Sequence, residues 1–341
     1  MKRILLYIVG LTLGLVLSAQ QLPQSSMYMM NNYLLNPAEG GTEDFIDIQA
    51  GYRTQWVGFD DGKGPKTIYV SAHTPLGKHS VSKDTNHNYN NAEIEAMTKP
   101  MGYHGAGGVI LSDGAGHFQT VELKGSYAYH MPMGRHFFLS LGGFVGVKQT
   151  SVDGDLAYNP DGTADPIAGG DNYNSSLNPD LTLGIWGYHK SYYFGVSVFQ
   201  VLGSSIDVAP DGDSDGKQNQ HIFVTGGYKL SLKKTTKHLD EIFLVPSLLV
   251  KILPGVPVTT DLNLKLNYHH KYWGGVSFRL GNEEESFVML AGITLKDIFD
   301  VGYAYDVTLN GLNKVSNGSH ELMLGLRLPN HQHQAPQKQF W

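Results

Sequence analysis

Val301-Gly-Tyr-Ala-Tyr-Asp-Val-Thr-Leu-Asn310, followed by a turn and by Ser319-His-Glu-Leu-Met-Leu-Gly-Leu-Arg-Leu328, is the stretch that decides the fold. Apolar and polar residues alternate in both halves with the period of two that a β-strand imposes. The two halves therefore predict a hairpin with one apolar and one polar face. The same pattern recurs along almost the whole chain, and charges on the polar face of most strands indicate that the apolar face meets lipid.

Residues 1–19 are predicted to be a secretory signal peptide. Met1-Lys-Arg3 supplies the positive start, residues 4–17 form an apolar run, and Ser18-Ala19 ends it. A run of about 14 apolar residues is too short to span a bilayer, which argues against a transmembrane anchor. The sequence contains no Cys, so lipid attachment to a cysteine and disulfide bonds are both excluded.

The composition favours a membrane barrel over a soluble protein. Charged residues make up 16% of the chain, whereas about 25% is typical of soluble proteins. The chain has 41 Gly, 19 Tyr and 14 Phe; Gly permits strand bends, and Tyr concentrates at membrane interfaces. The net charge of −6 gives no indication of a nucleic-acid partner.

The alternating segments predict an all-β fold, a transmembrane antiparallel outer-membrane β-barrel of about 14 strands with both ends periplasmic. The barrel is expected over residues 45–328, and a C-terminal tail over 329–341. The predicted strands cover residues 45–53, 66–75, 102–112, 119–130, 136–148, 180–188, 192–201, 220–231, 241–251, 258–269, 271–280, 286–295, 299–309 and 319–328.

The lengths of the connections predict the orientation of the barrel. Short turns at 131–135, 189–191 and 269–271 alternate with long polar loops at 149–178, 203–218 and 310–318. Barrels of this class have short periplasmic turns and long outer loops. The polar connection 76–101 breaks the alternation, so either a short helix or plug lies there or the strand count is wrong by two.

The segment 20–44 precedes the first strand and is rich in Gln, Asn and Met. It is too polar to insert into lipid. We expect this N-terminal polar segment to line the lumen or the periplasmic rim.

Nine charged residues fall on the polar face and are assigned to the lumen, because Arg or Lys on the lipid face costs about 2–4 kcal/mol at the membrane midplane. Two interpretations compete: a network of ion pairs that fills a narrow lumen, and a polar pore or peptide-docking site. Interleaved charges of both signs favour the network. The nine are Arg53, Glu122, Lys124, Lys148, Asp261, Lys265, Arg279, Asp306 and Arg327.

Asp211, Asp213 and Asp215 alternate before Gly216, as in the first half of a calcium-binding loop. The glutamate that should close the loop is replaced by Ile222, so an acidic loop tip is the favoured interpretation and calcium the alternative. No other cofactor is expected. The 15 His are scattered, and no nucleotide-binding or nucleophile motif is present, so we do not expect an enzyme.

A set of motifs in a fixed order resembles the PorP/SprF family of type IX secretion membrane proteins. Each motif is weak alone, but the ordered set covers nearly all of the sequence after residue 19. The motifs are Gln20-Gln-Leu-Pro-Gln-Ser-Ser-Met-Tyr-Met-Met-Asn-Asn-Tyr-Leu-Leu-Asn-Pro-Ala38, Tyr52-Arg-Thr-Gln-Trp-Val-Gly-Phe59, Ser71-Ala-His-Thr-Pro-Leu76, Ser126-Tyr-Ala-Tyr-His130, Tyr272-Trp-Gly-Gly-Val-Ser-Phe-Arg279, Gly302-Tyr-Ala-Tyr-Asp306 and Gly318-Ser-His-Glu-Leu-Met-Leu324.

The resemblance implies an outer-membrane protein of Bacteroidota that acts in type IX secretion and gliding motility. Its expected partner is a secreted surface protein, bound through a C-terminal targeting domain for export or surface anchoring. Membership of the envelope-spanning machine, with other secretion or motility components and periplasmic lipoproteins as neighbours, is the second role that it implies. The alternative from a different class is a channel or FadL-like uptake pore for small solutes, since 14 strands can enclose either.

Overall fold

The computed structural model describes residues 22–59, 64–77, 100–116, 118–134, 136–152, 174–204, 218–234, 240–281 and 285–330. Within these ranges, no helix is long and apolar enough to cross a membrane. The predicted signal peptide, most of the 76–101 connection and most of the tail lie outside them.

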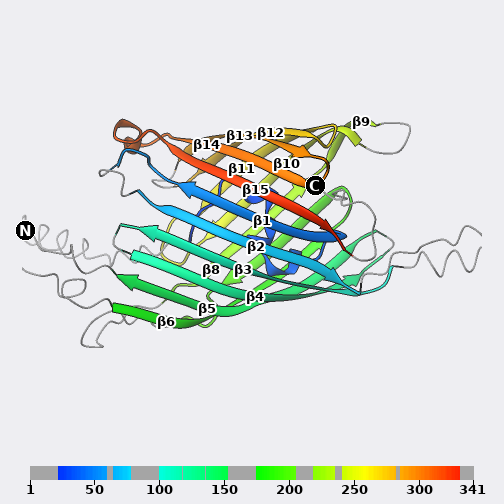
Figure 1. Ribbon diagram of the computed structural model, residues 1–341, viewed down its shortest axis with the longest axis horizontal. Coiled ribbons are helices and arrows are strands. Elements are labelled where there is room, and N and C mark those ends of the chain that lie inside the picture. The colour runs from blue at the N-terminus through cyan, green and yellow to red at the C-terminus, as the bar shows by residue number, and fades with distance from the viewer. Residues whose placement is uncertain are drawn as a thin grey trace, which may run out of the picture.

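The described residues form a closed antiparallel barrel of 14 wall strands, which confirms the predicted fold and strand number (Figure 1). Each strand pairs with its sequence neighbours, and β1 pairs with β15 to close the wall. The strand segments are β1 (Phe45–Thr54), β2 (Lys66–Leu76), β3 (Tyr103–Ala115), β4 (Phe118–Pro132), β5 (Phe138–Val152), β6 (Asn174–Tyr188), β7 (Tyr192–Phe199), β8 (His221–Tyr228), β9 (Leu230–Lys234), β10 (Asp240–Ile252), β11 (Thr259–Tyr268), β12 (Tyr272–Leu280), β13 (Ser286–Leu295), β14 (Phe299–Thr308) and β15 (Ser319–Pro329).

The segments β8 and β9 are two parts of one wall strand. Both pair with β10, and the break between them falls at Lys229. Pro246 of β10 lies at this level and has no N–H to donate. The predicted single strand over 220–231 is therefore interrupted because its neighbour lacks one ladder hydrogen bond.

Alternation along the strands sorts the side chains to two faces. On β11, Leu264 is 44% exposed, whereas its neighbours Asn263 and Lys265 are 6% and 3% exposed. Val301 and Tyr303 on β14 likewise alternate with buried Gly302. The outer surface is thus apolar and the inner wall polar, the reverse of a soluble protein and the arrangement that a lipid environment requires.

The two ends of the barrel differ in their connections. We call one the turn end, because the connections 189–191 and 269–271 lie there, where β1 begins and β15 ends. The opposite end, the loop end, holds the connections 55–65, 153–173, 200–220 and 309–318.

The loop between β5 and β6 is shorter than the predicted 149–178. Residues 149–152 and 174–178 belong to the strands. They are mostly polar on both faces, so the period-two apolar signal fades there although the hydrogen-bonded ladder continues.

A single arginine on the outer wall tests the lipid-facing assignment. We expect Leu264→Arg, in the middle of β11, to lower the yield of folded barrel, since Arg near the membrane midplane costs about 2–4 kcal/mol. Val315→Arg is the matched control: Val315 is 54% exposed, but lies in the 309–318 connection. Heat-modifiable mobility on unheated gels measures the folded fraction. Equal yields from the two variants would contradict the assignment.

Candidate functional site: the plugged lumen

Residues 22–44 lie inside the barrel, and we call this segment the plug. It begins at the loop end, where Leu22 and Trp56 line the same cavity. It ends at the turn end, where Gly41 N donates to His73 Nδ1 at 3.2 Å. Its path contains three short 3-10 turns, η1 (Tyr28–Met30), η2 (Asn32–Leu34) and η3 (Pro37–Glu39). Parts of this segment are visible in Figure 1 as the dark blue trace behind the wall strands.

An ionic cluster holds the plug near the loop end. Arg53 Nη2 lies 2.7 Å from Asp306 Oδ2, and Arg53 Nη1 lies 3.1 Å from Glu321 Oε2. Ser26 of the plug joins both carboxylates: its backbone N–H donates to Glu321 at 2.7 Å and its hydroxyl to Asp306 at 2.6 Å. Arg53 and Glu321 are register partners across the β1–β15 seam. The plug is therefore fastened where the first and last strands meet.

The cluster continues onto β11 and β12 and is balanced in charge. Arg279 Nε lies 3.0 Å from Asp261 Oδ1, and Lys251 Nζ lies 3.1 Å from Asp261 Oδ2. Arg279 also receives a plug contact, since its Nη1 donates to Gln24 Oε1 at 3.0 Å. Three cations, Arg53, Lys251 and Arg279, thus face three carboxylates. Because buried charges are stable only when they are paired, this balance fixes the arrangement.

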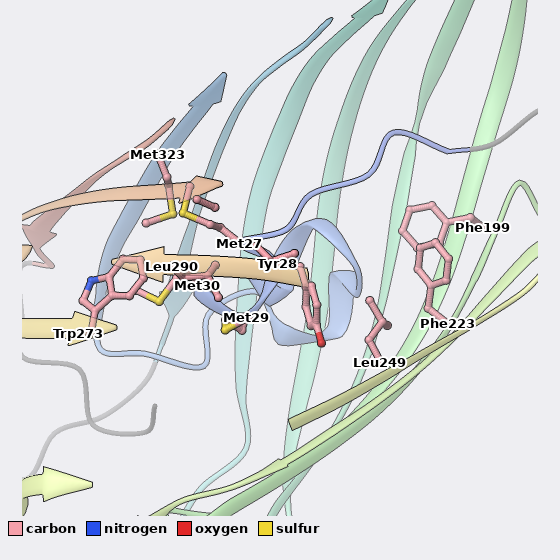
Figure 2. Close-up of a cluster of buried hydrophobic side chains, with 12 residues drawn as sticks. Met27, Tyr28, Met29, Met30, Phe199, Phe223, Leu249, Trp273, Leu290 and Met323 are labelled. Atoms are coloured by element: carbon pink, nitrogen blue, oxygen red, sulfur yellow. The ribbon is translucent and has the colours of Figure 1, made fainter. Parts of the chain in front are cut away.

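Apolar packing holds the middle of the plug. Figure 2 shows Met27, Tyr28, Met29 and Met30 between two groups of wall side chains. Methionine is unbranched and polarizable, and so fills irregular gaps between a plug and a wall of fixed shape. The wall residues are Trp273, Leu290 and Met323 in one group and Phe199, Phe223 and Leu249 in the other.

A strip of small residues receives η3 near the turn end. Gly105 lies opposite Ala128, Ala128 opposite Gly142, and Gly142 opposite Gly184, so one register line crosses β3 to β6. A Cβ atom on Gly142 would lie 2.6 Å from Ala38 Cα, closer than any real contact. The plug backbone therefore touches the wall there because no side chain intervenes.

Asn36 fixes the plug against β6 and β7. Its side-chain amide donates to Ile185 O at 2.9 Å and to Val196 O at 3.2 Å, and its Oδ1 accepts from Ala38 N at 3.0 Å, which caps η3. Ser197 Oγ donates to Leu35 O at 2.5 Å. Asn36, near the end of the first of the ordered motifs, thus ties the plug to two strands at once.

His130 forms the polar contact at the turn end of the plug. Its ring is fully buried, lies stacked on Tyr103 at 4.3 Å between centroids, and has Nε2 2.9 Å from Gly40 O. A carbonyl oxygen only accepts, so Nε2 donates to Gly40 O, while Nδ1 lies 3.0 Å from the Tyr188 hydroxyl. The imidazole joins the plug to β4 and β6.

Two further ionic groups line the inner wall. Lys124 Nζ lies 2.7 Å from Glu122 Oε2 and 2.6 Å from Asp180 Oδ2, and Lys148 Nζ lies 3.8 Å from Glu122 Oε1. At the turn end, Arg327 pairs with Asp300.

The structure places all nine charged residues that the sequence assigned to the lumen in buried inward positions, at 9% exposure or less. It divides eight of them among the three ionic groups, whereas Lys265 Nζ lies 3.5 Å from Met30 Sδ of the plug. Sequence reasoning did not name the ion partners Asp180, Lys251, Asp300 and Glu321. Strand alternation indicates the inward direction of Asp300 and Glu321, but not which charges they meet.

The calcium candidates Asp211, Asp213 and Asp215 lie outside the described residues. Within the described ranges, no group of three or more His, Cys, Asp or Glu side chains is arranged to hold a metal ion.

A valine at Gly142 tests the fit between the plug and the wall. We expect Gly142→Val to displace η3 and to open the plug to chymotrypsin at Tyr33 and Leu34, because overpacking costs about 1–3 kcal/mol. Gly125→Val is the control, since Gly125 faces outward and its nearest neighbour would lie 4.0 Å from the new Cβ. Mass spectrometry of the purified barrel after limited digestion shows the cut sites. Protection of residues 22–44 in both variants would refute the close fit.

Solved structures of hydrocarbon channels share the fold. The CymD monoaromatic hydrocarbon channel matches with a TM-score of 0.52 and 10% identity, covering 91% of this chain and 94% of the channel. The deltaS2S3 mutant of the TodX monoaromatic hydrocarbon channel gives 0.50 and 7%, covering 88% and 94%. The Ralstonia pickettii toluene transporter TbuX gives 0.48 and 10%, covering 90% and 94%. At these identities the likeness concerns the fold alone.

A comparison with curated proteins found no match. A comparison with protein families matched residues 17–326 to "Type IX secretion system membrane protein PorP/SprF". The family and the barrel together locate the protein in the outer membrane. Because the match spans most of the sequence, the chain belongs to the PorP/SprF family of type IX secretion system membrane proteins.

Proposed function

We propose that this barrel is an outer-membrane partner in type IX secretion that binds a secreted surface protein through its C-terminal targeting domain, for export or for anchoring at the cell surface. The role is one of binding rather than catalysis. The family match supports the secretion context. The observation that carries the proposal is the plug, which fills the lumen from the loop end to the turn end.

A filled lumen favours a docking role over a transport role. Met27 and Tyr33 are fully buried, and Ser26 is held by two carboxylates. Releasing the plug would leave Asp306 and Glu321 without the hydrogen bonds from Ser26, and a buried acceptor that loses its donor costs free energy. Such a plug suits a scaffold whose ends, rather than its interior, do the binding.

The alternative is passage of a small solute, as the names of CymD and TodX say of those proteins. The likeness to them covers 91% and 88% of this chain and concerns the fold alone. A cavity of about 280 Å³ lies at the loop end, whereas a cavity beside the plug, lined by Leu34, Phe144 and Phe199 among others, measures about 70 Å³. This arrangement favours the partner role.

The loop end is the side on which we place the partner. Long connections on a rigid barrel are suited to recognition, because the scaffold positions them while their sequences vary. In barrels of this class the longer loops face the outside. The proposed orientation therefore exposes the loop end to the medium and the turn end to the periplasm, where the other secretion or motility components would contact it.

The path of the plug makes the orientation testable. The sequence predicted both ends to be periplasmic, whereas the plug begins at the loop end; we therefore expect an epitope inserted directly before Leu22 to be labelled by antibody on intact cells. The same epitope after Asn330, beyond β15 at the turn end, is the control and should be labelled only after the outer membrane is permeabilised. The reverse pattern would invert the orientation.

Loop exchange tests the side of partner binding. We expect replacement of residues 153–173 by a short Gly/Ser turn to leave the barrel folded but to abolish co-purification of the secreted protein and its retention in the outer membrane. Replacement of 78–99, a turn-end connection of similar length, is the matched control and should retain the partner. Mild-detergent purification with quantitative mass spectrometry is the measurement.

Two outcomes count against the proposal in different ways. If the wild-type barrel brings down no secreted protein, the partner role fails. If only the 78–99 replacement loses the secreted protein, the partner binds the turn end and the assignment to the loop end is wrong.

A further inference from the structure

The loop-end cavity of about 280 Å³ lies between the start of the plug and the barrel rim. Leu22 and Pro23 of the plug form one wall, and Trp56 and Pro65 of the β1–β2 connection form another. Ala115 at the end of β3 also lines it. These residues give the cavity mostly apolar walls at the end where the proposed function places the partner.

Trp56 is held in an unusual backbone conformation. Its φ of 50° lies in the left-handed region, which a bulky side chain rarely adopts. Trp56 N donates to Ser319 Oγ at 3.2 Å. The next residue is fixed on both sides, since Val57 N donates to Gly318 O at 2.9 Å and Asn317 N donates to Val57 O at 2.7 Å. Strained backbone conformations that the surrounding hydrogen bonds hold in place are found preferentially at ligand-binding sites.

The charged groups beneath the cavity do not call for a charged ligand. Arg53 is paired with Asp306 and Glu321, and Arg279 with Asp261. An ionic ligand would have to compete with these buried pairs.

Polar groups on the cavity wall suit a peptide backbone. Gln55, Asp113 and Thr308 line the cavity beside the apolar walls. Amide N–H groups can donate to the carboxylate of Asp113, and amide carbonyls can accept from the side chains of Gln55 and Thr308.

The volume fits one or two side chains. A cavity of about 150 Å³ holds one benzene ring, whereas pockets for drug-sized ligands span about 300–1,000 Å³. An apolar side chain on an extended peptide uses both the apolar walls and the polar groups at their edge.

We propose that this cavity is the pocket in which the secreted partner anchors an uncharged apolar side chain from an extended segment of its C-terminal targeting domain, with Trp56 as the main specificity-determining residue. This inference rests on the proposed function and adds the site and the chemistry of the contact. Buried aromatic residues in well-packed pockets dominate binding energies at such interfaces.

Two variants disturb the pocket from opposite sides. Trp56→Gly removes the ring and suits the left-handed φ, so the barrel should still fold. Ala115→Trp leaves Trp56 in place and fills the cavity. The control is Phe118→Ala, which removes a 53% exposed aromatic side chain. Phe118 begins β4, directly after the turn that follows Ala115. Unheated gels verify that all three variants are folded.

The probe is the purified C-terminal targeting domain of a secreted surface protein that co-purifies with the wild-type barrel, titrated onto the detergent-solubilised barrel by calorimetry. We expect both pocket variants to raise the Kd at least tenfold and the control to leave it within twofold of the wild type. Wild-type binding with an unchanged Kd in both pocket variants overturns the pocket alone. No binding by the wild type overturns the pocket together with the proposed function.

Discussion

Charge pairing inside a lipid-facing wall is the constraint on which the rest of the structure depends. The outer surface has to be apolar, so most charged residues of the described strands are directed into a lumen that the chain's own N-terminal segment occupies. Arg53, Asp306 and Glu321 are stable there because the cluster to which they belong balances three cations against three carboxylates, and because Ser26 donates a hydrogen bond to each of the two carboxylates. The plug therefore has two roles: it forms hydrogen bonds with charged groups of the wall, and it fills the lumen.

The barrel wall could be predicted from sequence because the alternation of side chains between its two faces is visible in neighbouring residues. Leu264 and Lys265 are adjacent and point to opposite media, and a period of two is visible without any knowledge of the fold. The strand count follows from repeating that observation. The ends of β5 and β6 could not be found this way, because Gln149 and Ser175 lie on the outer face but are polar, so they carry no apolar signal.

The interior depends on contacts between distant residues, and no local pattern encodes them. Asn36 bonds to backbone carbonyls of β6 and β7, about 150 residues further along the chain. Gly142 is one of many glycines in the sequence, and only the structure shows that Ala38 occupies the space a side chain would need. Pro246 lies within the continuous strand β10, but the break it causes falls in the neighbouring strand, between β8 and β9. Sequence reasoning expected the segment 20–44 at the lumen or the rim, but gave neither its direction nor its contacts.

The position of Ser26 at the β1–β15 seam has a consequence for assembly. Arg53 and Glu321 come together only when the last strand meets the first, and Ser26 contacts both members of that pair. The plug lies inside the ring and is continuous with β1 at the turn end. Threading it into a finished barrel would require residues 22–26 to pass the part of the lumen in which Met27–Met30 are packed against the wall. Closure around a plug already in place avoids that step. The N-terminal segment then acts as an internal template, and the ring closes only when this segment is in place.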